Sequence, residues 1–209
     1  LHHRRIVASN VGKMSQKELD ATFPKMVDSL LAICNCHPDD NILVHTHSYK
    51  LNGMLADALQ TKGDVLRPIV TYRRSADRDT ALSKFRSLPR SVLLAPSMDR
   101  GIDLAGDSCR VVVISKVPYP YLGDSQVSAR LHLPGGQTWY NVQTVRTIVQ
   151  MTGRAVRSKN DYATTYILDG SFMKFWSKGK SLLPDWWRES VTVVSPRQLL
   201  DGRYDLSEP

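Results

Sequence analysis

Long apolar runs and cysteines are scarce in this sequence. No segment approaches the roughly 20 consecutive apolar residues that cross a bilayer, and no basic stretch followed by an apolar one marks a secretory signal near the start. The 209 residues include three cysteines, an odd number too small for a disulfide framework, which favours a reducing compartment. We therefore expect no membrane partner and a protein that is not secreted.

Signatures of two common site types are also missing. The pattern G-x-S-x-G does not occur, which excludes the nucleophile elbow of an α/β hydrolase. Cys34, Cys36 and His37 stand close together, but no second ligand pair follows at the spacing of a zinc site. We therefore expect no metal site in this chain.

Positive charge, by contrast, is in excess. Lys and Arg number 28 against 20 Asp and Glu, which gives a net charge of +8 and a pI near 9.5. A pI above about 9 is common in nucleic-acid-binding domains, but charge alone leaves a nucleic-acid partner and an ordinary basic surface about equally open. Hydrophobic residues make up 42% of the chain, which is sufficient for a globular core.

Short β-branched runs alternate with amphipathic stretches. The apolar spacing predicts a helix at residues 15–34, for which Ser15 and Glu18 form a capping box. Further patterns predict strands at 41–46, 65–70, 91–95, 110–116 and 163–168, and helices at 48–59, 77–86 and 138–156. This alternation predicts an α/β fold with a mainly parallel sheet covered by helices on both faces. Ligands of such sheets bind at the carboxyl ends of the strands.

The most informative local pattern lies near the end of the last predicted helix. Gln150, Gly153, Arg154 and Arg157 recur at i, i+3, i+4 and i+7, so they share one helical face. A glycine inside a helix lowers helix stability by about 1 kcal/mol relative to alanine. Close approach of a ligand or a second backbone to this face would explain why a glycine is present. Two guanidinium groups and an amide suit a polyphosphate, although a solvated basic helix end explains the same residues equally well.

A second pattern follows a predicted buried strand. Residues 95–104 form a small, polar, glycine-containing segment whose backbone N–H groups and hydroxyl can hold phosphates. Asp103 can accept a hydrogen bond from a ribose hydroxyl. Taken alone the pattern is weak, because loops after strands are commonly rich in glycine and aspartate.

Together these segments resemble superfamily 2 helicases. Residues 43–49 resemble motif IV, residues 97–104 resemble motif V, and residues 150–157 match the Q-x-x-G-R-x-x-R pattern of motif VI. Pro-Tyr-Pro before motif VI and Leu-Asp after it resemble the XPD/DinG branch, although Arg100 stands where that branch usually carries glutamate.

The resemblance covers about residues 40–175 and implies the second, C-terminal RecA-like domain of a DNA helicase. We accordingly expect a domain at 41–175, with an N-terminal segment and helix at 1–40 leading into it and a short C-terminal appendage at 176–209. ATP and Mg²⁺ would bind mainly to a first RecA-like domain, because this chain lacks the G-x-x-x-x-G-K-[ST] loop. The implied enzyme is an ATP-dependent helicase that moves along single-stranded DNA, 5′ to 3′ in this branch. Such an enzyme is expected to be cytoplasmic or nucleoid-associated, or nuclear in a eukaryote. This chain alone is expected to be inactive.

The resemblance also implies roles for individual residues. Arg154 and Arg157 would act as arginine fingers on the γ-phosphate, Gln150 would place water, and Gly101, Asp103 and Gly153 would couple the nucleotide site to the DNA-facing loops. Contact with nucleic acid is expected from two loops and a basic segment, at Thr46, His47, Ser48, Tyr49, Arg73, Arg74, Ser97 and Arg100.

Several alternatives stay open on the sequence alone. The basic segment 67–90 fits a phosphate-tracking groove and a solvated helix face equally well. Tyr72 fits a core or rim position better than base stacking. The excursion at 122–138 fits a loop near DNA or a surface loop anchored by aromatic residues. The whole chain also fits a stand-alone RecA-like module that binds nucleic acid or a partner without hydrolysing ATP.

Overall fold

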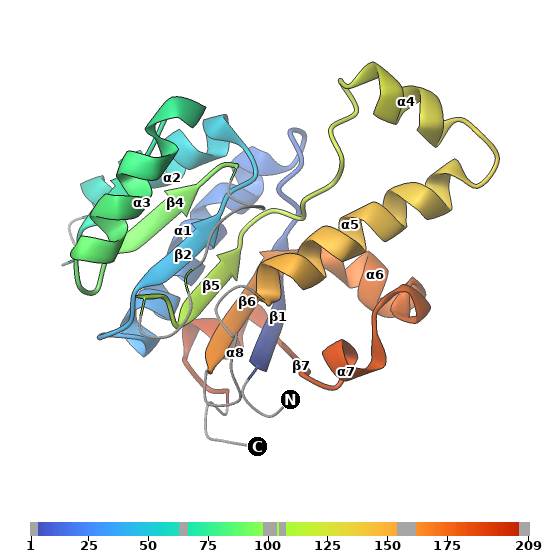
Figure 1. Ribbon diagram of the computed structural model, residues 1–209. Helices are drawn as coiled ribbons and strands as arrows, with labels where there is room; N and C mark the ends of the chain where they lie inside the picture. Colours follow the sequence, from blue (N-terminus) through green and yellow to red (C-terminus); the bar gives the residue numbers. More distant parts are fainter. Residues whose placement is uncertain (1–3, 63–66, 98–103, 105–107, 154–161, 205–209) are drawn as a thin grey trace.

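Seven strands form the sheet of the computed structural model, which describes residues 4–62, 67–97, 104, 108–153 and 162–204 (Figure 1). The strand order is β3-β4-β2-β5-β6-β1-β7, and every pair of neighbours is parallel. The strands are β1 (Arg4–Gly12), β2 (Ile42–His45), β3 (Ile69–Thr71), β4 (Val92–Ala95), β5 (Val111–Ile114), β6 (Ala163–Asp169) and β7 (Val191–Val194). The predicted α/β class with a parallel RecA-like sheet is confirmed.

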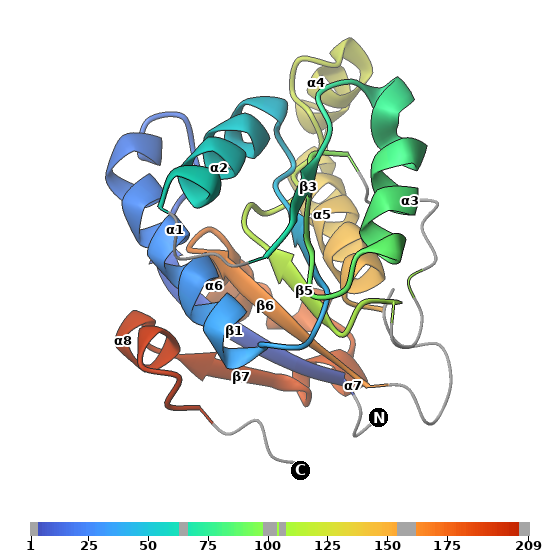
Figure 2. The same cartoon turned by 90° about the vertical axis from the view of Figure 1, so that its left-hand side faces the viewer.

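Helices cover both faces of the sheet (Figure 2). One face carries α1 (Leu19–Cys36), α2 (Tyr49–Thr61) and α8 (Pro196–Leu200). The other carries α3 (Arg78–Ser87), α5 (Gly136–Thr152), α6 (Phe172–Lys178) and α7 (Asp185–Arg188). The remaining helix, α4 (Ser125–Leu131), projects from the body together with the start of α5 (Figure 1). Among the residues described, no helix is long and apolar enough to cross a membrane.

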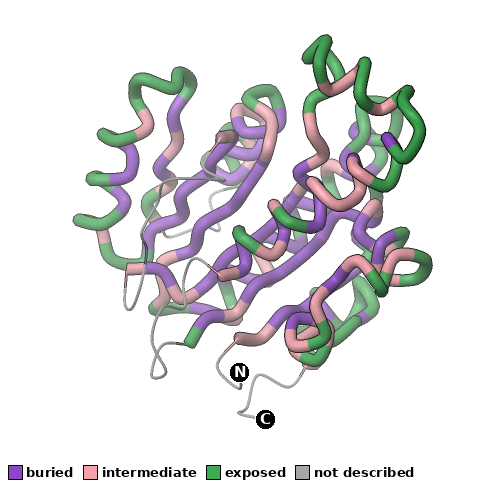
Figure 3. Tube along the Cα trace, turned by 45° about the vertical axis from the view of Figure 1, so that its right-hand side comes forward, coloured by how far each residue is buried: buried purple, intermediate pink, exposed green. Residues whose placement is uncertain are grey.

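The central strands are buried along their whole length. All four residues of β2, of β4 and of β5 are buried, and Leu43 lies between Leu93 and Val112 in neighbouring strands. Figure 3 shows this buried centre, with the exposed residues mainly on the outer turns of the surrounding helices and in the loops. Because helices cover both faces, these strands appear in the sequence as continuous apolar runs rather than alternating ones.

The sheet extends beyond the domain boundaries expected at residues 40 and 175. β1 lies between β6 and β7, with Ile6 beside Thr165 on one side and Val191 on the other. Trp187 of α7 is fully buried and shares a core cluster with Ile148 of α5. The N-terminal segment at 1–40 and the C-terminal appendage at 176–209 thus each supply a strand to the same sheet as the residues between them.

Two helix ends also differ from expectation. α1 begins at Leu19, and the Ser15 hydroxyl bonds Glu18 Oε2 at 3.2 Å instead of capping the helix backbone. Glu18 also pairs with Lys13 at 3.7 Å, so its carboxylate is engaged outside the helix. α5 ends at Thr152, which places Gly153 at the C-cap and removes the expected cost of a glycine in the helix interior.

Candidate functional site

The carboxyl ends of β2, β3 and β4 bring three loops together around Ser97. The Tyr49 hydroxyl lies 3.4 Å from Ser97 Oγ, and the Tyr72 hydroxyl lies 3.2 Å from the same atom. The backbone N–H of Ser97 also donates to the Tyr72 hydroxyl at 3.3 Å. Two predicted nucleic-acid residues from separate loops, Tyr49 and Ser97, thus lie side by side at this edge.

The two tyrosines of this cluster have different exposures. Tyr49 is 45% exposed, whereas Tyr72 is 3% exposed and meets the Tyr49 ring edge to face, with 6.4 Å between centroids. Burial raises the pKa of Tyr72, so its hydroxyl stays neutral. Tyr72 is therefore a core residue that supports the cluster, while the Tyr49 side chain remains partly exposed at its surface.

The loop after β2 is held by its own polar side chains. Thr46 is fully buried and donates to Asn52 Oδ1 at 3.1 Å, and Ser48 caps α2 by accepting from the Leu51 N–H at 3.3 Å. Direct contact of the Thr46 side chain with nucleic acid is not possible in this structure, because it points into the protein. His47 has a φ of +50°, a left-handed conformation that costs a non-glycine residue about 1–2 kcal/mol and is frequent at functional sites.

Asn52 is a site residue that the sequence analysis missed. It is 2% exposed, accepts from Thr46, and donates to Thr71 Oγ1 at 2.5 Å and to the Tyr72 carbonyl at 3.4 Å. Its amide therefore joins the loop after β2 to the end of β3. The available signal was a polar residue on the inward side of the predicted helix at 48–59, where a buried amide needs partners.

A groove of about 550 Å³ lies beside this cluster, between α2 and the end of β3. Its lining includes Tyr49, Lys50, Gly53, Asp57 and Arg73. A side chain on Gly53 would meet no atom within 4 Å, so the floor of the groove is open at that point. The groove therefore offers an exposed aromatic ring with two cations nearby. Arg74, the next residue, is also exposed.

The other predicted site residues lie at the end of α5. Gln150 is exposed in the last turn of the helix, and Gly153 caps it close to the Arg4 side chain, whose Nη1 lies 3.8 Å from the Cβ position of that glycine. Of the four residues expected on one helical face, the structure describes Gln150 in α5 and Gly153 at its C-cap. Gly101, Asp103, Arg100, Arg154 and Arg157 lie outside the described residues.

A buried tryptophan fixes the end of α5. Trp187 Nε1 donates to Thr152 Oγ1 at 2.8 Å, and that hydroxyl donates in turn to the Val149 carbonyl at 3.0 Å. Because an indole N–H can only donate, the Thr152 proton is directed at Val149. The Val149 carbonyl therefore accepts a side-chain hydrogen bond in the last turn of α5, directly before the C-cap residue Gly153.

The described residues supply no site of their own for a metal ion. Within them, no group of three or more His, Cys, Asp and Glu side chains is placed to hold one. The polar groups at the end of α5 and at the carboxyl edge include amide, hydroxyl and guanidinium groups, which suit anionic ligands better than cations.

Comparisons with known proteins agree with this geometry. A family model described as the helicase C-terminal domain matches residues 30–190. The chain is 29% identical to the Regulator of telomere elongation helicase 1 homolog of Drosophila yakuba, over 71% of this chain and 18% of that protein. The chain thus spans less than a fifth of the length of this relative.

Solved structures share the fold at lower identity. S. tokodaii Xpd4 superposes with a TM-score of 0.66 and 16% identity, over 91% of this chain and 39% of that one. S. cerevisiae Dbp5 bound to RNA and ADP BeF3 superposes with a TM-score of 0.64 and 15% identity, over 97% of this chain and 44% of that one. Because the family model matches most of the 209 residues, this chain belongs to the helicase C-terminal domain family.

Proposed function

We propose that this chain is the second RecA-like lobe of an ATP-driven motor that moves along single-stranded DNA. The observation that carries the proposal is the arrangement at the carboxyl edge, where the Tyr49 hydroxyl lies beside Ser97 and Tyr49 and Arg73 line one groove. An exposed ring, a hydroxyl and a guanidinium are the groups that bind a single strand through stacking and phosphate contacts. Family membership supports the motor part of the proposal.

ATP with Mg²⁺ would bind between this chain and a first RecA-like domain of the same protein. Arg154 and Arg157 of motif VI would supply positive charge to the transferred phosphoryl group, as arginine fingers do, and Gln150 would help to place water. Closure of the two lobes on ATP and their opening after hydrolysis would move the strand. The 5′ to 3′ direction is part of the same proposal and rests on the resemblance to the XPD/DinG branch.

Charge reversal tests the strand-binding part. In the longer protein, in which this chain follows a first RecA-like domain, the double variant Arg73→Glu and Arg74→Glu is expected to weaken single-strand binding. Each lost phosphate contact should also reduce the slope of log affinity against log salt by about 0.7. Fluorescence anisotropy with a labelled oligonucleotide at several salt concentrations measures both.

The matched control is Lys17→Glu with Lys25→Glu, which makes the same charge change at exposed positions before and on α1. The control should leave the salt slope within error of wild type. Equal salt slopes for the two double variants would show that Arg73 and Arg74 belong to a solvated face and would contradict the proposed interface.

A further inference from the structure

An arm of residues 120–139 extends from the body, and its helix α4 buries no residue (Figure 1). Isolated helices shorter than about 12 residues are marginal in water, so α4 depends on its N-cap and on its contacts with α5. Large apolar side chains are exposed on the arm, with Tyr121 at 79%, Leu122 at 50% and Leu133 at 62%. Such exposure in one segment is typical of a binding surface.

Local interactions hold the arm in place. The Asp124 carboxylate caps α4 by accepting from the N–H groups of Gln126 and Val127 at 2.8 and 3.2 Å. Gly135 turns the chain with a φ of +76°, and a side chain on Gly136 would lie 2.3 Å from the Arg130 carbonyl oxygen. The two glycines therefore permit a turn and a close approach of helices that other residues would prevent.

The base of the arm is fixed to the sheet. Asp169, at the end of β6, accepts from the Val117 N–H at 2.9 Å. Tyr119 and Tyr140 stack with 5.8 Å between their centroids, and the Tyr140 hydroxyl donates to the Pro120 carbonyl at 2.9 Å. The arm is thus held at both of its ends by buried contacts.

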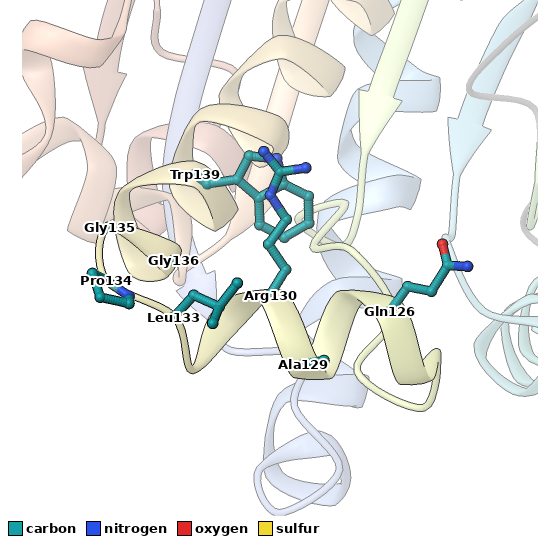
Figure 4. Close-up of a pocket in the computed structure, with 8 residues that line it drawn as sticks. All are labelled: Gln126, Ala129, Arg130, Leu133, Pro134, Gly135, Gly136 and Trp139. Atoms are coloured by element: carbon teal, nitrogen blue, oxygen red, sulfur yellow. The ribbon is translucent and has the colours of Figure 1, made fainter.

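A cavity of about 540 Å³ lies in the angle between α4 and α5 (Figure 4). Arg130 reaches from α4 across the ring of Trp139 on α5, with its guanidinium carbon 4.5 Å from the ring centroid. Leu133, Pro134 and Gly135 line the end where the two helices join. The cavity therefore combines a flat cationic and aromatic stack with an apolar wall.

Charge and position indicate the ligand. Asp124 is the only acidic residue of the arm, and its carboxylate is engaged by the helix backbone, which leaves Arg130 as the dominant charge beside the cavity. The arm stands on the side of the molecule toward which β4 and β5 point, where the loops around Ser97 also lie (Figure 1). A nucleobase has flat faces that stack on aromatic rings and guanidinium groups, and it is attached to an anionic backbone.

We infer that the cavity between α4 and α5 binds one base of the single strand, stacked against Trp139 and Arg130. The inference rests on the proposed function and adds a base-stacking site on the arm to the backbone contacts at the carboxyl edge. Stacking on an aromatic side chain depends little on base identity, so the site suits a motor that tracks any sequence.

A scan with abasic nucleotides tests the site. A single abasic position is moved along an oligonucleotide, and its affinity for the longer protein is measured by anisotropy. In the wild type, abasic replacement at the position that meets the arm should weaken binding at least about fivefold, the lower limit for loss of one stacked base. With Trp139→Ala this penalty should disappear, and with Trp139→Phe part of it should remain.

Trp176→Ala is the matched control, because Lys180 Nζ lies 4.5 Å from the Trp176 ring centroid in a similar cation–aromatic pair away from the arm. The abasic profile, meaning the affinity measured at each position of the abasic nucleotide, should be the same for Trp176→Ala as for wild type. Arg130→Ala provides a second test variant that keeps Trp139 and should reduce the same penalty; circular dichroism checks that each variant is folded.

An abasic profile that is the same in wild type, Trp139→Ala and Arg130→Ala, with strand binding intact, would overturn the base site and leave the proposed function standing. The arm would then be expected to contact another part of the longer protein. If the wild-type protein bound no single strand at all, the proposed function and the base site would both be wrong.

Discussion

Replacing Arg154 by alanine in the longer protein is expected to lower the kcat of its ATPase by about 10³–10⁵, the range for loss of an arginine finger. Charge develops on the phosphoryl oxygens in the transition state, and a guanidinium at the domain interface stabilises it there more than in the ground state. Single-strand affinity without nucleotide should stay close to wild type, because the cluster around Ser97 that we propose to bind the strand lies on other loops. Steady-state phosphate release and oligonucleotide anisotropy measure the two effects.

Arg146→Ala is the control for this prediction, since Arg146 is an exposed arginine on α5 two turns before Gly153. Its ATPase should remain within about twofold of wild type, as for an ordinary surface substitution. If Arg154→Ala kept an ATPase comparable to that of Arg146→Ala, the role assigned to motif VI would be wrong.

Replacing Trp187 by alanine should destabilise the chain by about 3–5 kcal/mol, the usual range for a large aromatic residue removed from a core. Trp187 is fully buried against Phe172 and donates its indole N–H to Thr152, so the variant loses packing and leaves a cavity beside α5. Urea unfolding followed by far-ultraviolet circular dichroism measures the loss in free energy of unfolding.

The neighbouring tryptophan provides the comparison. Trp186 is only partly buried, and Arg4 lies over its ring at 5.7 Å. Trp186→Ala should therefore lower the free energy of unfolding by less than half as much as Trp187→Ala does. Equal and small losses in the free energy of unfolding at both positions would contradict the close packing of Trp187 against α5 and α6.

The central part of the fold could be predicted because its strands are buried on both faces. β2, β4, β5 and β6 all appear as β-branched or aliphatic runs, and the helices between them show apolar residues at helical spacing. β1 and β7 were missed for a physical reason. β1 carries arginine, serine, asparagine and glycine along its length, and its partners β6 and β7 lie at the far end of the chain.

The candidate site was predictable as motifs but not as a contact network. The motif residues at 46–49 and 97 follow two separate strands, and the structure brings Tyr49 and Ser97 together. The roles of Thr46 and Asn52 depend on which side chain points inward, and the left-handed backbone of His47 has no signature in the sequence. The arm could be recognised only as an irregular excursion, because its shape depends on contacts between α4 and α5.

ATP hydrolysis between two lobes is tested by comparing ATP turnover by the 209-residue chain with turnover by the longer protein, each with single-stranded DNA. We expect DNA-stimulated turnover by the longer protein and none above background by the chain alone, because the phosphate-binding loop is absent from this sequence. Circular dichroism must show that both are folded. DNA-stimulated turnover by the isolated chain at a rate near that of the longer protein would contradict the claim that ATP is hydrolysed only between two lobes.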